Sequence, residues 1–463
     1  MNPRMTRRTF LDSAMTSVLA ASAFPAILPS FAAAGRSKSG SPNTRVNVAA
    51  IGVGPQGQGV MSGILAQPNA RVVVVCDLMD RHRDQARERV NRQYGNQECA
   101  VASDFREVLA RPDIDAVMIA TPDHWHVPVA LAAANAGKDI YLEKPMGLSV
   151  ADDRRLRSAV QRQKRIFQFG TQQRSSREFQ KAVELVRNGR IGELRRINVW
   201  APASRPGGPT SEYPVLPGLD YDRWLGPAAA TPYTDGKAAD NPSTGVWKTW
   251  WYNYDYALGF IAGWGVHPLD IAWWGFPEMM RSAIKVEGRG VIPTTGAGNT
   301  AVSWDVEFQL AKGVTMRYRG TANEHPERLA LHDLSDWSER YGKIEGHGTA
   351  FEGTEGWVEV HRGGLRTHPA SLAEETLDGR ATFKARRSDS HQRDWIESIL
   401  SRRPAVCSIE ESVQADVLCH LSDIAVRLGR PLRYDARGER FEGDREANAR
   451  LEARPARAPW GTA

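Results

Sequence analysis

The sequence lacks the signs of several common protein classes. Only 4 of its 463 residues are cysteine, and none of these forms a C-x-x-C pair, so no cysteine-based metal or redox motif is predicted. A Cys407–Cys419 disulfide stays open, because the spacing neither requires nor forbids it. The formal net charge is +6, but no basic block carries interleaved aromatic residues, and we expect no nucleic-acid partner. We find no internal repeat, and the length predicts two or more domains.

A long uninterrupted apolar run is also missing. The alanine-rich segment 14–31 is short and interrupted by prolines, which argues against a permanent membrane span. It follows the twin-arginine motif of Thr6–Leu11 and precedes three alanines at 32–34. We therefore expect 1–34 to be a twin-arginine signal peptide and 35–44 a linker. The prediction is a periplasmic or otherwise exported protein; an amphipathic N-terminal tail is the alternative.

From Arg45 onward the chain alternates strand and helix patterns, which is typical of an α/β fold with a parallel, doubly wound sheet. Strands are expected at 46–51, 72–76, 115–120, 139–142 and 166–169. Helices are expected at 79–94, 104–109, 127–136, 150–163 and 176–187, and later at 391–401 and 411–428. We assign 45–171 to a Rossmann dinucleotide-binding domain, 172–430 to a substrate-binding α/β domain, and 431–463 to a tail that packs back on the body.

The second domain does not continue the alternation of strands and helices. Strand patterns at 195–200, 282–291, 301–310, 314–318 and 356–360 predict a large, open, mainly antiparallel sheet. Residues 201–243 are rich in Pro and Gly without a regular pattern. A segment of that length and composition is expected to cover an active site or to meet another subunit.

A glycine-rich turn follows the first strand. Gly52, Gly54 and Gly57 have the spacing G-x-G-x-x-G, and Asp77 ends the second predicted strand. The glycines permit a tight turn, close approach of a pyrophosphate and close helix–strand packing, and the acid accepts from ribose hydroxyls. Asp77 would repel a 2′-phosphate, so NAD is expected, while the nearby Arg81 leaves NADP open. The alternative is a glycine-rich loop that binds nothing.

Two further predicted strands also end in polar residues. Thr121, Pro122 and His126 follow one of them, and Glu143 and Lys144 follow the next. Ligands of parallel sheets bind beyond the carboxyl ends of the strands, so one crevice could hold all five residues at the cofactor. A lysine beside a cationic nicotinamide ring could shuttle a proton; an ordinary salt bridge is the alternative.

The pair of histidines at 124 and 126 could suggest a metal site. No cysteine or clustered carboxylate completes a set of ligands in the sequence, and we predict no metal. Capping of a helix by Asp123 and a loop that lines the nicotinamide are the interpretations that we prefer for this stretch.

The second half contributes a histidine and a dense group of aromatic residues. His267 precedes Pro268, which could open a helix and place Asp270 one turn further on. His267 could exchange a proton with a substrate hydroxyl, or it could be a capping or core histidine. Trp251 and Trp264 are candidates for contact with a sugar ring, with Asp255 as a hydrogen-bond acceptor; packing is the alternative for most of these aromatics.

Together these motifs resemble the Gfo/Idh/MocA oxidoreductases. They are the glycine fingerprint with its acid, T-P-x-x-x-H ending at His126, E-K-P at Glu143–Pro145, and G-x-H-x-x-D at Gly265–Asp270. The resemblance extends from Arg45 to Trp460, and the C-terminal text resembles exported members. It implies a Rossmann domain, a C-terminal domain whose open sheet often mediates oligomer contacts, and hydride transfer to or from a sugar or polyol.

The resemblance also implies residue roles. Lys144 and His267 match the family's proton-handling pair, and Asp270 is carried as a further catalytic candidate. Family dehydrogenases often have Asp four residues before the histidine, whereas this chain has Gly263. Asp255 or Asp270 could substitute for that carboxylate.

The sequence thus predicts an exported oxidoreductase that holds NAD and acts on a small sugar, polyol or sugar derivative, and a homo-oligomer. One alternative is a glycosidase that oxidises the sugar ring transiently. The other is a binding or scaffolding protein with a vestigial nucleotide site.

Overall fold

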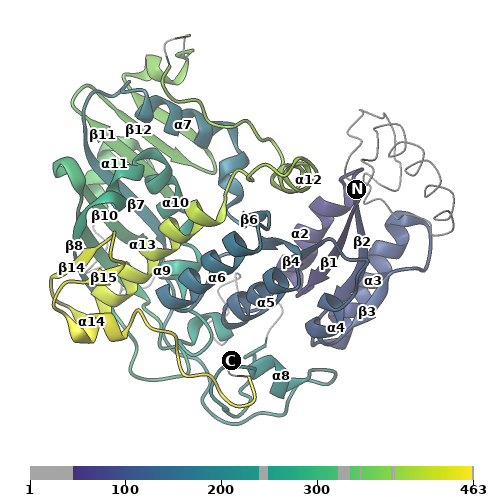
Figure 1. Ribbon diagram of the computed structural model, residues 1–463. Helices are drawn as coiled ribbons and strands as arrows, with labels where there is room; N and C mark the ends of the chain where they lie inside the picture. The colour runs from purple at the N-terminus through teal and green to yellow at the C-terminus, as the bar shows by residue number, and fades with distance from the viewer. Residues whose placement is uncertain are drawn as a thin grey trace, which may run out of the picture. The chain divides into compact units, whose positions relative to one another are not determined.

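Short apolar strands form the first sheet of the computed structural model, which describes residues 45–238, 249–321, 334–344, 346–376, 379 and 381–460. Within these residues the sheet has six parallel strands in the order β3-β2-β1-β4-β5-β6 (Figure 1). The strands are β1 (Val46–Ile51), β2 (Ala70–Cys76), β3 (Ala100–Ala102), β4 (Ala116–Ile119), β5 (Asp139–Leu142) and β6 (Phe167–Phe169). The strand order reverses between β1 and β4, which is where such sheets bind ligands.

Helices follow these strands as the alternating pattern predicts. They are α2 (Pro55–Leu65), α3 (Asp80–Tyr94), α4 (Phe105–Leu109), α5 (Asp123–Asn135) and α6 (Val150–Arg162). Asp104 and Ser149 cap α4 and α6 by accepting hydrogen bonds from backbone N–H groups, and Gly95 ends α3 in the left-handed conformation. Such local signals explain why most predicted boundaries lie within two residues of the observed ones.

The start of α5 differs from its prediction. It begins at Asp123 rather than at 127, and Pro122 holds the N-cap position without a side-chain cap. Asp123 is therefore the first helical residue and not the cap. Tertiary hydrogen bonds stabilise the additional turn, because the backbone N–H of His124 donates to the carbonyl of Tyr256 and the His126 ring lies between two carbonyls.

The second sheet has nine strands among the described residues, in the order β13-β12-β11-β7-β10-β9-β8-β14-β15. Its pairs are antiparallel except for β7 with β10. The strands are β7 (Leu194–Pro202), β8 (Ala283–Val291), β9 (Ser303–Gln309), β10 (Thr315–Thr321), β11 (Gly348–Gly353), β12 (Trp357–His361), β13 (Gly364–His368), β14 (Leu432–Asp435) and β15 (Arg440–Phe441). The expected open, mainly antiparallel sheet is confirmed, and it is wider than predicted because β11 and β13 to β15 have weak strand patterns.

Helices that follow the first sheet in sequence pack on both sheets. Figure 1 shows α10 (Val266–Gly275) and α13 (Ile409–Leu428) beside the nine-stranded sheet, where they contact β7 and β8; α7 (Arg177–Arg187) contacts β12. In contrast, α12 (His391–Ser401) packs on α2 and β1 of the first sheet and buries Trp395 completely. The remaining α-helices of the described residues are α8 (Tyr221–Leu225), α9 (Phe260–Gly263), α11 (Ser335–Tyr341) and α14 (Arg445–Ala449).

The four cysteines all lie in the described ranges. Each is free and buried, so the Cys407–Cys419 disulfide is not formed.

Among the described residues, no helix combines the length and apolarity needed to cross a bilayer. The expected signal and linker, 1–44, lie outside the described residues.

Candidate active site

A cavity of about 500 Å³ opens at the carboxyl end of the first sheet, a volume within the usual range for ligand pockets. Residues of the glycine-rich turn meet residues of the second half of the chain in its wall. Of the predicted site residues, the wall contains Gly52, Gly54, Asp77, Thr121, Pro122, His126, Glu143, Lys144, Trp251, Trp264 and His267. The cavity therefore brings together most of the predicted cofactor residues and the two proposed proton-handling side chains.

The glycine-rich turn needs its glycines for different reasons. Gly52 has φ +78°, and a Cβ there would lie 2.6 Å from the backbone of Ala120 and Thr121. A Cβ at Gly57 would lie 1.9 Å from the Gly52 carbonyl oxygen, so only glycine allows α2 to pack this closely on the turn. Gly57 itself is not among the described residues that line the cavity. No described side chain caps the start of α2, and its first turn has no acidic residue. The helix N-terminus is thus left open to an anion.

Asp77, which directly follows β2, accepts hydrogen bonds from two backbone N–H groups. One carboxylate oxygen accepts from the backbone N–H of Val53 at 2.7 Å, and the other accepts from that of Met79 at 2.9 Å. A carboxylate has about four acceptor positions, so capacity remains for ribose hydroxyls. His82 lies 3.3 Å from the same carboxylate and also lines the cavity.

Lys144 reaches the cavity from the end of β5. Its Nζ lies 5.3 Å from the centre of the Trp251 ring, within range of a cation–π contact. The buried Glu143 beside it accepts a hydrogen bond from the Gln172 amide at 2.9 Å, and burial raises the pKa of the Glu143 carboxyl. Glu143 is thus held in place beside Lys144 rather than exposed as a surface ion-pair partner.

His267 approaches the cavity from the first turn of α10. It is 2% exposed, and burial, with further contributions from His347 and the Lys144 charge, holds the pKa of the imidazole well below 6.5. Its Nδ1 has no hydrogen-bond partner among the described residues. The ring stacks on His347 with centroids 5.4 Å apart and lies 6.2 Å from Trp264. The geometry thus places a neutral imidazole in the cavity wall, with its Nδ1 unpaired among the described residues.

Trp251 fills the space that a side chain at position 263 would occupy. A Cβ built on Gly263 would lie 2.5 Å from the Trp251 Nε1. The indole fills this space, and Lys144 meets its ring face. At Gly263, the cavity wall is therefore formed by the aromatic ring of Trp251.

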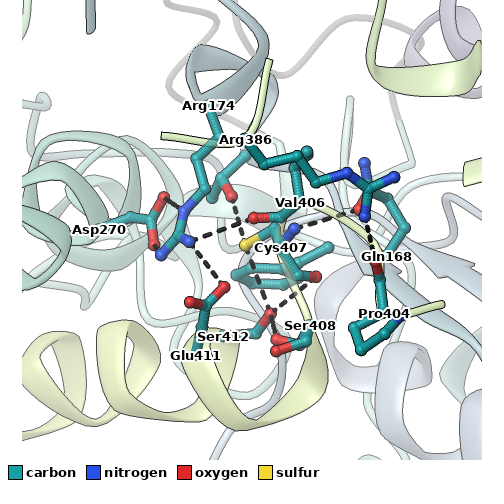
Figure 2. Close-up of polar contacts among 12 residues, drawn as sticks. Gln168, Arg174, Asp270, Arg386, Pro404, Val406, Cys407, Ser408, Glu411 and Ser412 are labelled. Atoms are coloured by element: carbon teal, nitrogen blue, oxygen red, sulfur yellow. Dashed lines mark hydrogen bonds and ion pairs between the residues drawn. The ribbon is translucent and has the colours of Figure 1, made fainter. Parts of the chain in front are cut away.

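Three other predicted residues lie elsewhere. Asp270 is fully buried and forms two hydrogen bonds, of 2.8 and 2.6 Å, with the Arg174 guanidinium (Figure 2). Asp255 and Arg81 are exposed, and neither they nor Asp270 is among the described residues that line the cavity. Sequence spacing placed Asp270 one turn from His267 correctly, but its carboxylate is already engaged by Arg174. None of the three is retained in the site.

Several wall residues were not predicted. Arg223 and Trp224 come from the Pro- and Gly-rich segment, and Trp460 comes from the C-terminal tail. Arg362, in the turn between β12 and β13, lies with its guanidinium 5.7 Å from the centre of the Trp264 ring. The composition of 201–243 hinted at a covering role, whereas no sequence signal marked Arg362.

The wall fits a dinucleotide. An uncapped helix start faces the cavity beside Gly52 and Gly54, and Thr121 Oγ1 has no partner among the described residues. Acceptor capacity remains at Asp77 for the ribose, and a carboxylate at the end of β2 disfavours a 2′-phosphate.

Comparisons with known proteins agree with this arrangement. Residues 46–171 match the family GFO_IDH_MocA, described as "Oxidoreductase family, NAD-binding Rossmann fold". Myo-inositol 2-dehydrogenase of Thermotoga maritima is 32% identical over 123 residues, 27% of this chain and 34% of that protein. A "Glycosyl hydrolase family 109 protein" of Saccharopolyspora erythraea is 37% identical over 109 residues, 23% and 24% of the two chains.

The solved structure of aldose-aldose oxidoreductase from Caulobacter crescentus shares the fold. Its TM-score is 0.59 at 18% identity, and the match covers 84% of this chain and 99% of that one. The sequence matches are shorter. In three curated relatives they span 42%, 34% and 33% of the relative's length. Over residues 46–171, this chain carries the NAD-binding Rossmann fold of the Gfo/Idh/MocA oxidoreductase family.

Proposed function

We propose that the protein oxidises or reduces a CH–OH group of a sugar, polyol or sugar derivative with a tightly held NAD. The observation that supports this most directly is the shared cavity of Lys144 and His267 with the glycine-rich turn. These side chains come from the two halves of the chain, and the fold brings both to one ligand-sized space. When bound there, NAD supplies the group that accepts or returns the hydride.

The proton would move between the substrate hydroxyl and His267. Burial keeps this imidazole neutral, so a ring nitrogen can accept the hydroxyl proton. The Lys144 ammonium donates a hydrogen bond to the same oxygen and stabilises negative charge as it develops. Trp251 and Trp264 offer flat apolar faces to the ring of the substrate, and Arg362 offers donors to its oxygens.

Substitution of Lys144 tests this assignment. Lys144→Met keeps most of the side-chain volume but removes the ammonium group, and we expect turnover to fall by at least about 100-fold, as for loss of a proton-transfer or electrostatic group. NAD should remain bound, because the glycine-rich turn and Asp77 are unchanged. The measurement follows nicotinamide absorbance and products while sugars, polyols and glycosides are screened against the purified holoprotein.

The matched control is Lys285→Met on β8, an exposed lysine outside the cavity wall. It should leave turnover unchanged. Full turnover by Lys144→Met with NAD bound would remove Lys144 from the reaction.

A glycosidase that uses transient oxidation is the second candidate. It is supported by several relatives named as glycosyl hydrolase family 109 proteins, each 28–37% identical over part of its length. Aryl glycosides separate the two candidates. Release of the aglycone without net formation of NADH supports the glycosidase, whereas stoichiometric NADH supports the dehydrogenase.

We further propose export by the twin-arginine route, because Arg7 and Arg8 precede the apolar segment. Replacement of both by Lys should retain the full chain in the cytoplasm, as measured by cell fractionation. If the variant were exported to the same extent as the wild type, the twin-arginine route would be rejected.

Self-association through the nine-stranded sheet is also proposed from the resemblance. It is tested by sedimentation of the purified protein.

A further inference from the structure

A second group of ionisable side chains lies outside the active-site cavity. Asp153 on α6 and Asp416 and His420 on α13 place their ligand atoms within 4.8 Å of one another. All three are buried, with exposed fractions of 0%, 0% and 3%. The group therefore lies in the interior, at the contact of two helices.

These side chains have few other partners. Both oxygens of Asp153, Oδ2 of Asp416 and Nε2 of His420 have no well-aligned hydrogen-bond partner among the described residues. The His420 Nε2 lies 3.3 Å from Asp153 Oδ2 and also 3.3 Å from Asp416 Oδ2. One N–H group can point at only one of two oxygens, and a charge-assisted N–H···O bond is usually about 2.7–2.9 Å long. The native groups therefore do not satisfy each other, although unsatisfied buried polar atoms are costly.

Two of the three separations, those from His420 Nε2 to the two carboxylates, fit a shared cation. Zinc bonds to carboxylate oxygen and imidazole nitrogen are about 2.0–2.2 Å, in tetrahedral geometry. The edge of such a tetrahedron is about 1.6 times the bond length, hence about 3.3 Å for the shorter bonds. Both observed nitrogen–oxygen separations match this edge, whereas they are long for direct hydrogen bonds.

The charge of the cluster is compatible with a divalent cation. With both carboxylates ionised and no proton added to the imidazole, the three side chains would carry two negative charges, which protons or one divalent cation must neutralise in a buried site. Arg157 lies one turn from Asp153 on α6, but its guanidinium is paired with Glu439 at 2.9 Å. Protons on His420 and on one carboxylate would balance the charge, and so would one divalent cation, which would also contact all three ligand atoms at once.

We propose that Asp153, Asp416 and His420 bind one divalent transition-metal ion, with Zn²⁺ the best fit to the ligand set and the spacing. The other oxygen of Asp416 accepts from the backbone N–H of Met146 at 3.1 Å, two residues after Lys144. The ion thus joins α6 to α13 and fixes, through Asp416, the segment that carries Lys144. Its role is structural and lies outside the proposed hydride transfer.

Metal analysis of the purified full chain tests the proposal directly. After expression with added zinc and removal of loosely bound ions, wild-type protein should contain about one Zn²⁺ per chain. Competition with a chromophoric zinc chelator then gives the affinity, and Co²⁺ substitution reports tetrahedral geometry by its visible absorption. These measurements need no substrate, so their outcome does not depend on the proposed oxidoreductase activity.

A pair of neighbouring variants gives the matched comparison. Asp153→Asn removes a ligand and should weaken zinc binding by more than about 100-fold, since loss of an outer partner alone costs about 10–100-fold. Asp152→Asn changes the next residue on the same helix, which interacts with Ser149 instead, and should retain the metal. Added Zn²⁺ should raise the melting temperature of wild type and Asp152→Asn, but not of Asp153→Asn.

Two results would overturn the proposal. Folded wild-type protein that takes up no Zn²⁺, Mn²⁺ or Co²⁺ would show that the cluster holds protons only. Equal metal binding by folded Asp153→Asn and wild type would place the ion elsewhere.

Discussion

Gly263 shows how one small residue alters the active-site wall. The indole of Trp251 lies so close that a Cβ at this position would overlap Nε1 at 2.5 Å and Cζ2 at 2.6 Å. A carboxylate could occupy this place only if Trp251 moved. The absence of a side chain at Gly263 therefore makes room for the Trp251 indole, whose ring face contacts the Lys144 ammonium.

Gly263→Ala is expected to lower the free energy of unfolding by about 1–3 kcal/mol, the usual cost of overpacking. In a Trp251→Ala background the same change should cost less, because the obstructing ring is gone. Urea unfolding of the two single variants and the double variant measures the coupling. Gly59→Ala on α2 is the control, since its Cβ meets nothing within 4 Å and alanine favours the helix by about 0.5–1 kcal/mol. Equal costs of Gly263→Ala in both backgrounds would contradict the steric account.

A buried histidine gives the protein a defined pH dependence. Burial lowers the pKa of His124 from 6.5 to about 4, while its Nε2 bonds to the carbonyl of Trp224 at 2.8 Å. The unfolded chain then binds a proton near pH 6.5 that the folded chain binds only near pH 4. The stabilisation from neutral His124 is complete above pH 6.5 and is lost as the pH falls toward 4.

His124→Gln removes this titration while keeping a donor for the Trp224 carbonyl. The stability advantage of wild type over the variant should shrink as the pH is lowered from 6.5 to 4, by about 1.4 kcal/mol per pH unit. Urea unfolding at several pH values measures the difference. His368→Gln, at an exposed residue, is the control. An advantage that stays constant over this range would refute the assignment.

At the scale of elements, Arg174 joins its own short 3-10 helix, Gln172–Ser175, to α10 and α13. Its guanidinium bonds to Asp270 on α10 and, at 2.7 Å, to Glu411 on α13 (Figure 2). Arg174 and Asp270 are 1% and 0% exposed as side chains. Burial without a partner would be costly for either charge, so the contact fixes α10, which carries His267.

Loss of one partner should therefore destabilise the fold strongly. Asp270→Asn leaves the Arg174 charge partly unpaired, and we expect the free energy of unfolding to fall by about 3–5 kcal/mol. Glu411→Gln, whose side chain is 34% exposed, should cost less because water can solvate the change. Chemical denaturation compares the two. A larger effect on NAD-dependent turnover than on stability in Asp270→Asn would instead assign Asp270 a direct catalytic role.

For the whole molecule, cofactor binding and stability are linked. A ligand that binds only the folded state stabilises it by RT ln(1 + [L]/Kd), about 2.7 kcal/mol at 100 times Kd. Protein freed of cofactor should show a melting temperature that rises with added NAD, and the rise with NADP should be smaller because Asp77 repels a 2′-phosphate. Asp77→Ala should reduce this difference. Equal shifts with both cofactors in wild type would contradict the role of Asp77.

Local patterns were sufficient for five of the six strands of the first sheet, whereas the three-residue strand β3 was not predicted. Short apolar strands, the glycine spacing and caps such as Ser149 act within a few residues, and their predicted positions agree with the structure. The start of α5 was predicted too late because its first turn depends on contacts with Tyr256 and Pro145. The edge strands β13 to β15 escaped prediction for a similar reason, since short strands are stabilised by their neighbours more than by their own sequence.

The sequence alone determined the NAD-binding Rossmann fold, because its signals lie within single strand–turn–helix units. It also identified Lys144 and His267 as a pair that meets at the cofactor, and the structure places both in the wall of one cavity. Tertiary structure alone decided that Asp270 belongs to Arg174, that Trp251 fills the space beside Gly263, and that Asp153 meets His420. These pairs are far apart along the chain, and their contacts arise only where folding brings separate helices and loops together.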